Sequence, residues 1–250
     1  MTTSPAALVE RLVAAHRGGT AVAIDGWVPP DVDTAFTVQD HVAKAMGGIA
    51  GWKVGAPAPA APALFAPIVS GRIWQAGAAA IAVPARYAVE IEIAVVIGRA
   101  FPAAASPPSA TDALAAVSKA HIALELCATR LTDWSKAPPM LNIADNQANY
   151  GLVLGPVVAD WRGLDAGRLR AIVEAGGKVL GDTTGGHAHK GLADLVVAQI
   201  GHCVTRRGGM PAGTVITTGS WTGIHWLDAP VRVTGRFDGF GEISVDLRRA

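Results

Sequence analysis

Apolar and polar positions alternate most regularly between Tyr87 and Gly98, in the segment YAVEIEIAVVIG. The segment is rich in β-branched residues, and this alternation predicts a β-strand. Because successive side chains of a strand point to opposite faces, Glu90 and Glu92 are expected on one face and the Val and Ile side chains around them on the other. The two carboxylates would then lie roughly 7 Å apart along the strand.

The first fifty residues instead carry the apolar spacing of helices. Ser4 and Pro5 suit the start of a helix over residues 5–16. A second helix is predicted over 35–45, with Asp33 or Thr34 as its N-cap and glycines after its end. The pattern therefore predicts a helical N-terminal region over 1–50 and a separate core over 51–250.

Beyond residue 50 the pattern changes to short apolar runs joined by segments rich in Pro and Gly. Strands are predicted at 50–55, 68–74, 87–98, 121–127, 150–158, 169–175, 215–218, 229–238 and 241–247. Irregular segments are predicted at 56–67, 101–111, 132–149 and 185–191, and further helices at 113–119 and 192–206. Helices first and many short strands afterwards indicate an α+β protein rather than a doubly wound sheet.

Composition limits the classes of partner. Half of the 250 residues are hydrophobic and 16% are charged, which allows a large core and favours a buried oligomer interface. A net charge of +1 gives no reason to expect nucleic acid or an acidic membrane surface as a partner. The two cysteines, the absence of a signal pattern and the lack of a membrane-length apolar run predict a cytoplasmic protein.

The carboxylates in apolar strands are the first candidates for chemistry. Glu125 lies in a second alternating segment, 121–127. Its side chain is expected on the opposite face of the strand from its Ile and Leu neighbours. Burial of ionised carboxylates is costly without a compensating positive charge, and no Lys or Arg lies within 87–98. A bound cation would compensate, and oxygen ligands suit Mg²⁺, Mn²⁺ or Ca²⁺. The alternative is that Glu90 and Glu92 face water on an edge strand.

Lys53 is the second candidate, in the segment GWKVG. The flanking glycines allow close backbone approach, and a desolvated lysine has a lowered pKa that suits proton exchange near neutrality. The alternative, favoured on spacing alone, is an ordinary lysine whose stem passes Trp52 toward solvent.

Other candidates have simpler interpretations. His187 and His189 could bind a transition metal, but their glycine-rich surroundings favour a solvent-exposed loop. Ser220 does not stand in a Gly-x-Ser-x-Gly elbow, which argues against a serine hydrolase. Cys127 is interpreted as a small buried residue rather than a nucleophile. Three tryptophans are expected either to wall a pocket or to fill the core: Trp52, Trp74 and Trp134.

Several short motifs occur in a characteristic order along the chain. They are AFTVQ at 35–39, GWKVG at 51–55, EIE at 90–92, IGR at 97–99, ALE at 123–125, RLTDW at 130–134, ADN at 144–146 and TGSWTG at 218–223. Together, from about Leu8 to Leu247, the chain resembles the 2-oxopent-4-enoate hydratase / 4-oxalocrotonate decarboxylase family of the fumarylacetoacetate hydrolase superfamily.

The resemblance implies a rolled, mixed β-sandwich core behind a small helical region. It implies Mg²⁺ or Mn²⁺, with the ligands on Glu90, Glu92 and Glu125. It further implies catalytic roles for Lys53 and Asp145 and substrate-binding roles for Gln39 and Asn146.

The implied activity is that of a lyase, either a hydratase or a decarboxylase, acting on a small unsaturated 2-oxo acid in aromatic-compound catabolism. A homo-oligomer is expected, with a possible complex with a pathway enzyme. Two alternatives stay open: an acylpyruvate-type C–C hydrolase, and a catalytically altered relative that acts as a partner subunit. A hydrolase normally needs a histidine base, and the first hundred residues offer only His16 and His41.

The chain also departs from the family pattern. The family usually has an acidic residue three positions after the third glutamate, where this chain has Ala128. The segment 66–74 lacks the carboxylate of the family's acidic loop. The segment 187–190 reads His-Ala-His-Lys, where a Gly-x-Pro-like turn is expected.

Overall fold

The structure, a computed structural model, describes residues 4–56, 58, 61–77, 79–189 and 191–250. The helices are α1 (Pro5–His16), α2 (Val32–Ala45), α3 (Ala110–Ala115), α4 (Pro139–Ala144) and α5 (Leu192–Arg206), with 3₁₀ turns η1 (Trp134–Lys136), η2 (Asn146–Ala148) and η3 (Trp161–Gly163). The strands are β1 (Ile49–Gly55), β2 (Leu64–Val69), β3 (Ile73–Gln75), β4 (Ile81–Val83), β5 (Tyr87–Ile97), β6 (Phe101–Pro102), β7 (Val117–Cys127), β8 (Asn149–Val157), β9 (Arg170–Ala175), β10 (Lys178–Thr184), β11 (Gly209–Met210), β12 (Val215–Thr217), β13 (His225–Leu227), β14 (Arg232–Phe237) and β15 (Gly241–Arg249).

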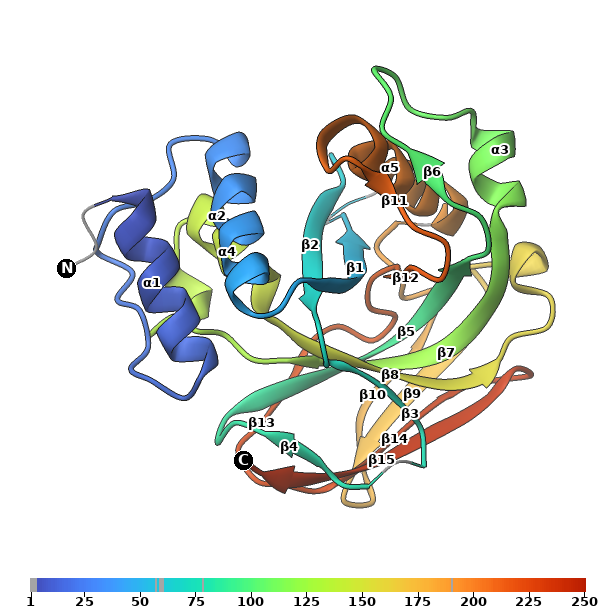
Figure 1. Ribbon diagram of the computed structural model, residues 1–250. Helices are drawn as coiled ribbons and strands as arrows, with labels where there is room; N and C mark the ends of the chain where they lie inside the picture. The colour runs from blue at the N-terminus through green and yellow to red at the C-terminus, as the bar shows by residue number, and fades with distance from the viewer. Residues whose placement is uncertain (1–3, 57, 59–60, 78, 190) are drawn as a thin grey trace.

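The larger sheet has the order β2-β1-β12-β5-β7-β8-β3, and β13 also pairs with β5. Most neighbours are antiparallel, whereas β1 and β12 run parallel, as do β3 and β8. A five-stranded sheet, β10-β9-β14-β15-β4, packs beneath the larger one (Figure 1). The expected α+β fold with a mixed β-sandwich core is therefore confirmed.

The two sheets meet through the apolar face of β5 and β7. Ile91 and Leu124 are fully buried there, in one cluster with Val173 and Val233 of the smaller sheet. A Cβ atom at Gly235 would lie only 2.9 Å from Ile91 Cδ1, so glycine lets β14 approach β5 closely.

A separate apolar cluster joins the N-terminal helices to the core. Leu8 and Leu12 of α1 and Phe36 of α2 pack with Leu141 and Ile143 of α4. These three helices lie together beside the sheets (Figure 1). The cluster includes α4 from residues 139–144, and the division of the chain at residue 50 stays a prediction. Within the described ranges, no helix is both long and apolar enough to cross a membrane.

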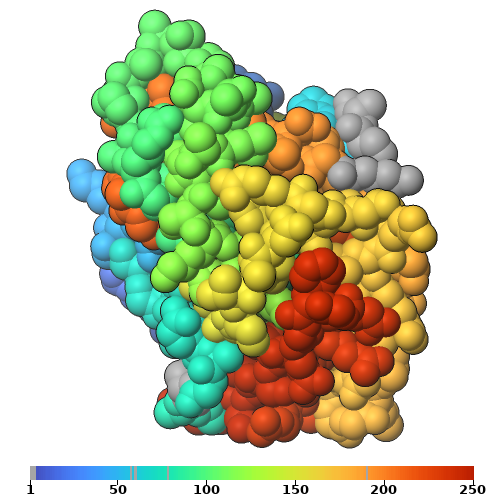
Figure 2. Space-filling model, turned by 90° about the vertical axis from the view of Figure 1, so that its right-hand side faces the viewer, coloured from blue at the N-terminus to red at the C-terminus, as the bar shows by residue number. Residues whose placement is uncertain are grey.

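The helices α1, α2 and α4 lie to the left in Figure 1, and Figure 2 views the molecule from its right-hand side. Seen from there, the surface is formed mainly by residues around 100–125 and 150–180 and by the C-terminal strands (Figure 2). Val157 and Val179 are among the exposed large apolar side chains, at 54% and 59% exposure.

Several predicted elements are confirmed. Helix α1 has Ser4 as its N-cap, with Ala7 N–H donating to Ser4 Oγ, and α5 spans the predicted range. Strand β5 ends one residue before the predicted limit. Helix α2 differs, because it begins at Val32 with Asp31 as its cap: Asp31 Oδ1 accepts a 2.7 Å hydrogen bond from Thr34 N–H.

Other boundaries were wrong where pairing overrides local composition. The predicted loop 56–67 contains the start of β2, in which Pro67 lies opposite Trp52 of β1. Residues 68–74 form the end of β2, a turn and the start of β3 rather than one strand. Helix α3 begins at Ala110, earlier than predicted, because Ser109 caps it. Residues 132–149 contain η1, α4 and η2. Residues 57, 59 and 60 of the predicted loop, and Lys190 of the 185–191 loop, lie outside the described residues.

Candidate active site and metal centre

Five neighbouring strands bring the candidate side chains together. The order β1, β12, β5, β7, β8 places Lys53 beside the strand pair that carries Glu90, Glu92 and Glu125. Glu90 and Glu125 are direct partners across the β5–β7 ladder. The edge-strand alternative is wrong, because β5 has neighbours on both sides and Glu92 and Glu125 are fully buried. Like charges facing each other in this way destabilise a sheet unless a cation offsets them.

Lys53 supplies one such cation. Its Nζ lies 2.9 Å from Glu125 Oε1 and 3.5 Å from Glu90 Oε2. Burial alone would lower the pKa of Lys53, but the carboxylates of Glu125 and Glu90 outweigh burial, and the pKa is raised. The expected lowering of the pKa is therefore wrong for the protein without a metal ion. The lysine does not extend into solvent either, since its side chain is 11% exposed.

Glu92 is held from the neighbouring strand and loop. Its Oε2 accepts hydrogen bonds from Thr217 Oγ1 and from Gly219 N–H, the second at 2.9 Å. Burial, followed by the charges of Glu125 and Glu90, raises the pKa of Glu92 well above its ordinary value. The site contains three carboxyl groups and one ammonium group, so its acidic groups outnumber its positively charged group.

Among the residues that the structure describes, two oxygen atoms of this cluster have no hydrogen-bond partner. They are Glu92 Oε1 and Glu125 Oε2, both buried. Unpaired buried carboxylate oxygens are costly and require an explanation. The shortage of positive charge and the all-oxygen donors of Glu90, Glu92 and Glu125 fit a hard divalent cation.

A cavity of about 380 Å³ opens onto the cluster. Lys53, Glu90, Glu92, Trp134, Gln147 and His187 are among the residues that line it. Of the three tryptophans considered from the sequence, Trp134 walls the cavity and Trp52 is buried in the core. The cavity is large enough for a small organic acid.

His187 was missed as a site residue. The expected solvent-exposed loop is wrong at this position, because His187 is 4% exposed and its Nε2 lies 2.8 Å from the carbonyl oxygen of Thr218. Its ring also contacts Trp221, with the centroids 5.0 Å apart. Burial lowers the pKa of His187, which keeps the ring neutral at neutral pH. The glycine-rich surroundings gave no signal of this burial, because it depends on the 217–221 segment folding over the histidine.

Asp145 and Gln39, to which the resemblance gives functional roles, form hydrogen bonds that hold other segments of the fold. Asp145 is buried, and its Oδ1 pairs with Arg130 Nε at 2.5 Å. Gln39 donates from Nε2 to the carbonyl oxygens of Phe65 and Ile143, at 3.1 and 2.6 Å. Neither is among the residues that line the cavity. A catalytic role for Asp145 and a substrate-binding role for Gln39 stay predictions.

Asn146 belongs to a strained segment next to the cavity. Asn146, Gln147 and Ala148 have φ values of 53°, 50° and 60°. Left-handed backbone costs roughly 1–2 kcal/mol for each residue other than glycine. The segment brings the Gln147 carbonyl oxygen to 3.5 Å from Lys53 Nζ. Asn146 Oδ1 is buried and has no hydrogen-bond partner in the described part of the chain. The substrate-binding role of Asn146 stays a prediction.

Arg130 maintains this strained connection. Its Nη1 donates to the carbonyl oxygens of Ala128 and Asn149, at 2.5 and 2.7 Å, in addition to the pair with Asp145. Removal of one partner from a buried ion pair leaves an uncompensated charge. Arg130→Met is therefore expected to reduce the free energy of unfolding by about 3–5 kcal/mol, measured by urea denaturation.

An exposed ion pair provides the control for that measurement. Arg170 pairs with Asp182 at 2.7 Å, but the two side chains are 44% and 40% exposed. Arg170→Met is expected to change the free energy of unfolding much less, because solvent screens this pair. Equal losses in the two variants would contradict the structural role of Arg130.

The fold and the site together define a class of protein: an α+β protein with a buried carboxylate cluster and a lysine, suited to a divalent cation. The family model for the fumarylacetoacetate (FAA) hydrolase C-terminal region matches residues 37–247. The chain belongs to this family, so the resemblance is confirmed at the level of the superfamily. A comparison with curated proteins found no match.

Solved structures support the fold assignment. The 4-oxalocrotonate decarboxylase from Pseudomonas putida G7, complexed with calcium and acetate, is 19% identical with a TM-score of 0.77, over 98% of this chain and 97% of that chain. The fumarylpyruvate hydrolase from Pseudomonas aeruginosa, in complex with Mn²⁺ and pyruvate, is 17% identical with a TM-score of 0.55, over 80% of this chain and 89% of that chain. The 2-hydroxyhepta-2,4-diene-1,7-dioate isomerase from Mycobacterium marinum is 20% identical with a TM-score of 0.58, over 80% and 76%.

Proposed function

We propose that this protein is a divalent-metal-dependent lyase that acts on a small unsaturated 2-oxo or 2-hydroxydienoic acid, of the kind formed in aromatic-compound catabolism. One observation carries the proposal: Glu90 and Glu92 line a cavity together with Lys53, and Glu125 pairs with Lys53 beside them. Among the described residues, one buried oxygen of Glu92 and one of Glu125 have no hydrogen-bond partner. Oxygen-rich sites of this kind hold Mg²⁺ or Mn²⁺ and leave positions open for a chelating acid.

The three glutamates would hold the cation. When bound, it would supply stabilisation of negative charge on the C2 oxygen of the 2-oxo acid. This assignment is supported by neighbours that contain such ions, including the decarboxylase complexed with magnesium and adipate and the hydrolase in complex with Mn²⁺ and pyruvate.

Lys53 carries the proton transfer. Before a cation binds, the carboxylates of Glu125 and Glu90 raise the pKa of Lys53, so the side chain enters the reaction protonated and can act as a proton donor. In decarboxylation of a vinylogous 2-oxo acid, the C–C bond to the leaving carboxylate breaks and its electron pair becomes conjugated with the C2 carbonyl. Lys53 then protonates the C2 oxygen or the carbon skeleton and regains a proton from solvent. The contact of Nζ with the Gln147 carbonyl oxygen orients the ammonium group.

Decarboxylation is favoured over water addition by the residues around the cavity. In the described part of the lining, the carboxylates are those of Glu90 and Glu92, and the His187 ring contacts the Thr218 carbonyl oxygen. Hydration and C–C hydrolysis both need a base that activates water, whereas decarboxylation needs an electron sink and a proton donor. His16 and His41, the candidate bases for a hydrolase, are not among the residues that line the cavity.

The test is an assay of the purified protein with Mg²⁺ or Mn²⁺ and 4-oxalocrotonate. Release of CO₂ that disappears in excess chelator and returns when Mg²⁺ is added is the expected result. Water addition to 2-hydroxypenta-2,4-dienoate would shift the assignment to a hydratase. Release of pyruvate from an acylpyruvate would support the hydrolase alternative, and turnover that is unaffected by chelator would refute a metal-dependent enzyme. The oligomeric state and a complex with a pathway enzyme stay predictions.

His187 supports the metal ligands indirectly. It contacts the carbonyl oxygen of Thr218, and the next residue, Gly219, donates its N–H to Glu92. His187→Ala is expected to weaken Mg²⁺ binding about 10–100-fold, the usual effect of losing a group that orients a ligand, measured by titration calorimetry. The neighbouring His189, which is not a cavity-lining residue, provides the control: His189→Ala should bind Mg²⁺ as the parent does. Unchanged affinity in both variants would remove His187 from this role.

A further inference from the structure

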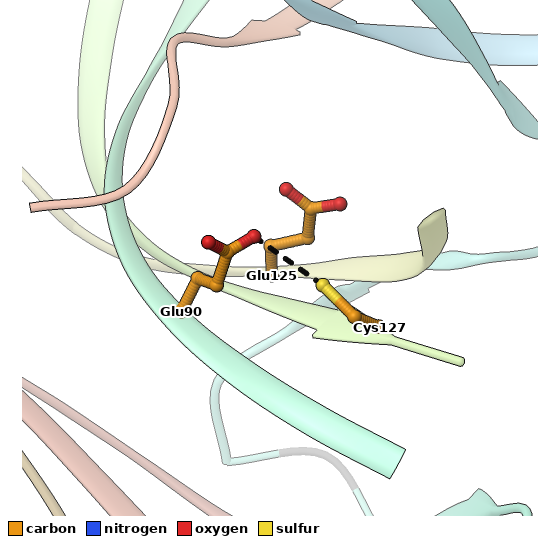
Figure 3. Close-up of side chains that lie close together, drawn as sticks. All are labelled: Glu90, Glu125 and Cys127. Atoms are coloured by element: carbon orange, nitrogen blue, oxygen red, sulfur yellow. Dashed lines mark hydrogen bonds between the residues drawn. The ribbon is translucent and has the colours of Figure 1, made fainter. Parts of the chain in front are cut away.

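Cys127 is a buried thiol that the proposed reaction does not use. It lies two residues after Glu125 on β7, so both side chains project from the same face of the strand. Its Sγ donates a 3.4 Å hydrogen bond to Glu90 Oε2. Figure 3 shows Glu90, Glu125 and Cys127 on the same side of the paired strands β5 and β7, with the Glu90 carboxylate and Cys127 Sγ directed toward each other. One donor atom from each of the three lies within 4.8 Å of the others.

The separations suit a cation that accepts sulfur. A tetrahedral zinc ion with a thiolate at about 2.3 Å and a carboxylate oxygen at about 2.1 Å holds sulfur and oxygen about 3.6 Å apart. The separation between Cys127 Sγ and Glu90 Oε2 is 3.4 Å without any ion. Glu125 is fully buried and has an unpaired Oε2, so the third ligand has a free donor atom.

The position between the carboxylates already favours a positive charge. The Lys53 ammonium group lies there, 2.9 Å from Glu125 and 3.5 Å from Glu90. We propose that Glu90, Glu125 and Cys127 form a sulfur-containing site for a thiophilic divalent cation, such as Zn²⁺ or Cd²⁺, which displaces the Lys53 ammonium group. Binding breaks the S–H bond, transfers the proton to the buffer and leaves the electron pair on sulfur as the metal ligand.

This site shares Glu90 and Glu125 with the proposed site for Mg²⁺ or Mn²⁺, and the two cations therefore compete. Thiolate ligands favour Zn²⁺ and Cd²⁺ over Mg²⁺, because the soft sulfur donor adds little affinity for a hard cation. The sulfur site depends on the donor atoms alone and does not require the proposed reaction to be correct.

The experiment uses Cd²⁺ as the probe and Cys203→Ser as the background. The chain has two cysteines, so Cys127 is the remaining thiol in that variant. Titration with Cd²⁺ is expected to produce a sulfur-to-cadmium charge-transfer band in the ultraviolet, with one equivalent bound and one proton released. Adding Cys127→Ser is expected to remove the band and to weaken Cd²⁺ binding about 100-fold.

Two outcomes would overturn the proposal. One is stoichiometric Cd²⁺ binding to Cys203→Ser without a charge-transfer band. The other is a band in the parent protein that Cys203→Ser abolishes, because the sulfur ligand would then be Cys203. The Cys203→Ser result stands even if Cys127→Ser does not fold. Mg²⁺ affinity and turnover are measured on the same samples. Absence of Mg²⁺ binding or of turnover would refute the proposed function, and the cadmium spectrum would stay the same.

Discussion

Replacement of Glu92 by Gln is expected to abolish turnover and to weaken Mg²⁺ binding by at least about 100-fold. The substitution keeps the size of the side chain but removes one of three negative charges and one of the two unpaired carboxylate oxygens. Titration calorimetry with Mg²⁺ and an assay of CO₂ release measure the two effects. The exposed glutamate of β15 provides the control, since Glu242→Gln should change neither.

The same substitution should have an opposite effect on stability without metal. The pKa of Glu92 is raised in the folded protein by burial and by Glu125 and Glu90. A carboxyl group with a raised folded pKa stabilises the protein below its unfolded pKa, and this stabilisation is lost as pH rises through the folded pKa. In chelator at neutral pH, Glu92→Gln should therefore unfold at a higher temperature than the parent. A variant that binds Mg²⁺ normally, or that is less stable than the parent in chelator, would contradict the metal-ligand assignment.

Lys53→Met is the second substitution with a large expected effect. It should lower kcat by about 10²–10⁴-fold, because the proton donor is lost from a buried site that holds it against Glu125. Mg²⁺ affinity should be retained or increased, since the ammonium group that competes for the carboxylates is absent. A lower kcat together with a retained Mg²⁺ affinity would show that the substitution removes proton transfer and not the bound metal ion.

The matched control for this substitution is Lys119→Met. Lys119 is exposed on β7, the strand that also carries Glu125, so the same chemical change is made outside the cavity. The control should keep the parent kcat. Retention of full activity by Lys53→Met, measured at saturating Mg²⁺ and substrate, would exclude the lysine from the chemical step.

The sequence by itself determined the strands that carry the site. Alternation in 87–98 and 121–127 predicted that Glu90 and Glu92 share a face and that Glu125 faces away from its apolar neighbours. The same local information predicted α1 and α5, because caps and apolar periodicity are encoded within a few residues. The ordered motifs extended this to the superfamily fold and to the divalent cation.

Only the tertiary structure decided which side chains meet. Glu90 and Glu125 are partners because β5 and β7 pair in one register, and Lys53 reaches them because β12, from residues 215–217, inserts between β1 and β5. Strand pairing between distant segments leaves no periodic signal at either segment. For the same reason the start of β2 at Leu64 was predicted as loop.

The tertiary structure also decided the electrostatics of the site. A lowered pKa was one of two interpretations of Lys53, made from the sequence without its partners, whereas two carboxylates from other strands raise the pKa. Local sequence gave no indication of a buried His187, which depends on contacts with Thr218 and Trp221. Charge and burial at a residue depend on everything that packs around it, and in this protein those neighbours come from segments more than thirty residues away in the chain.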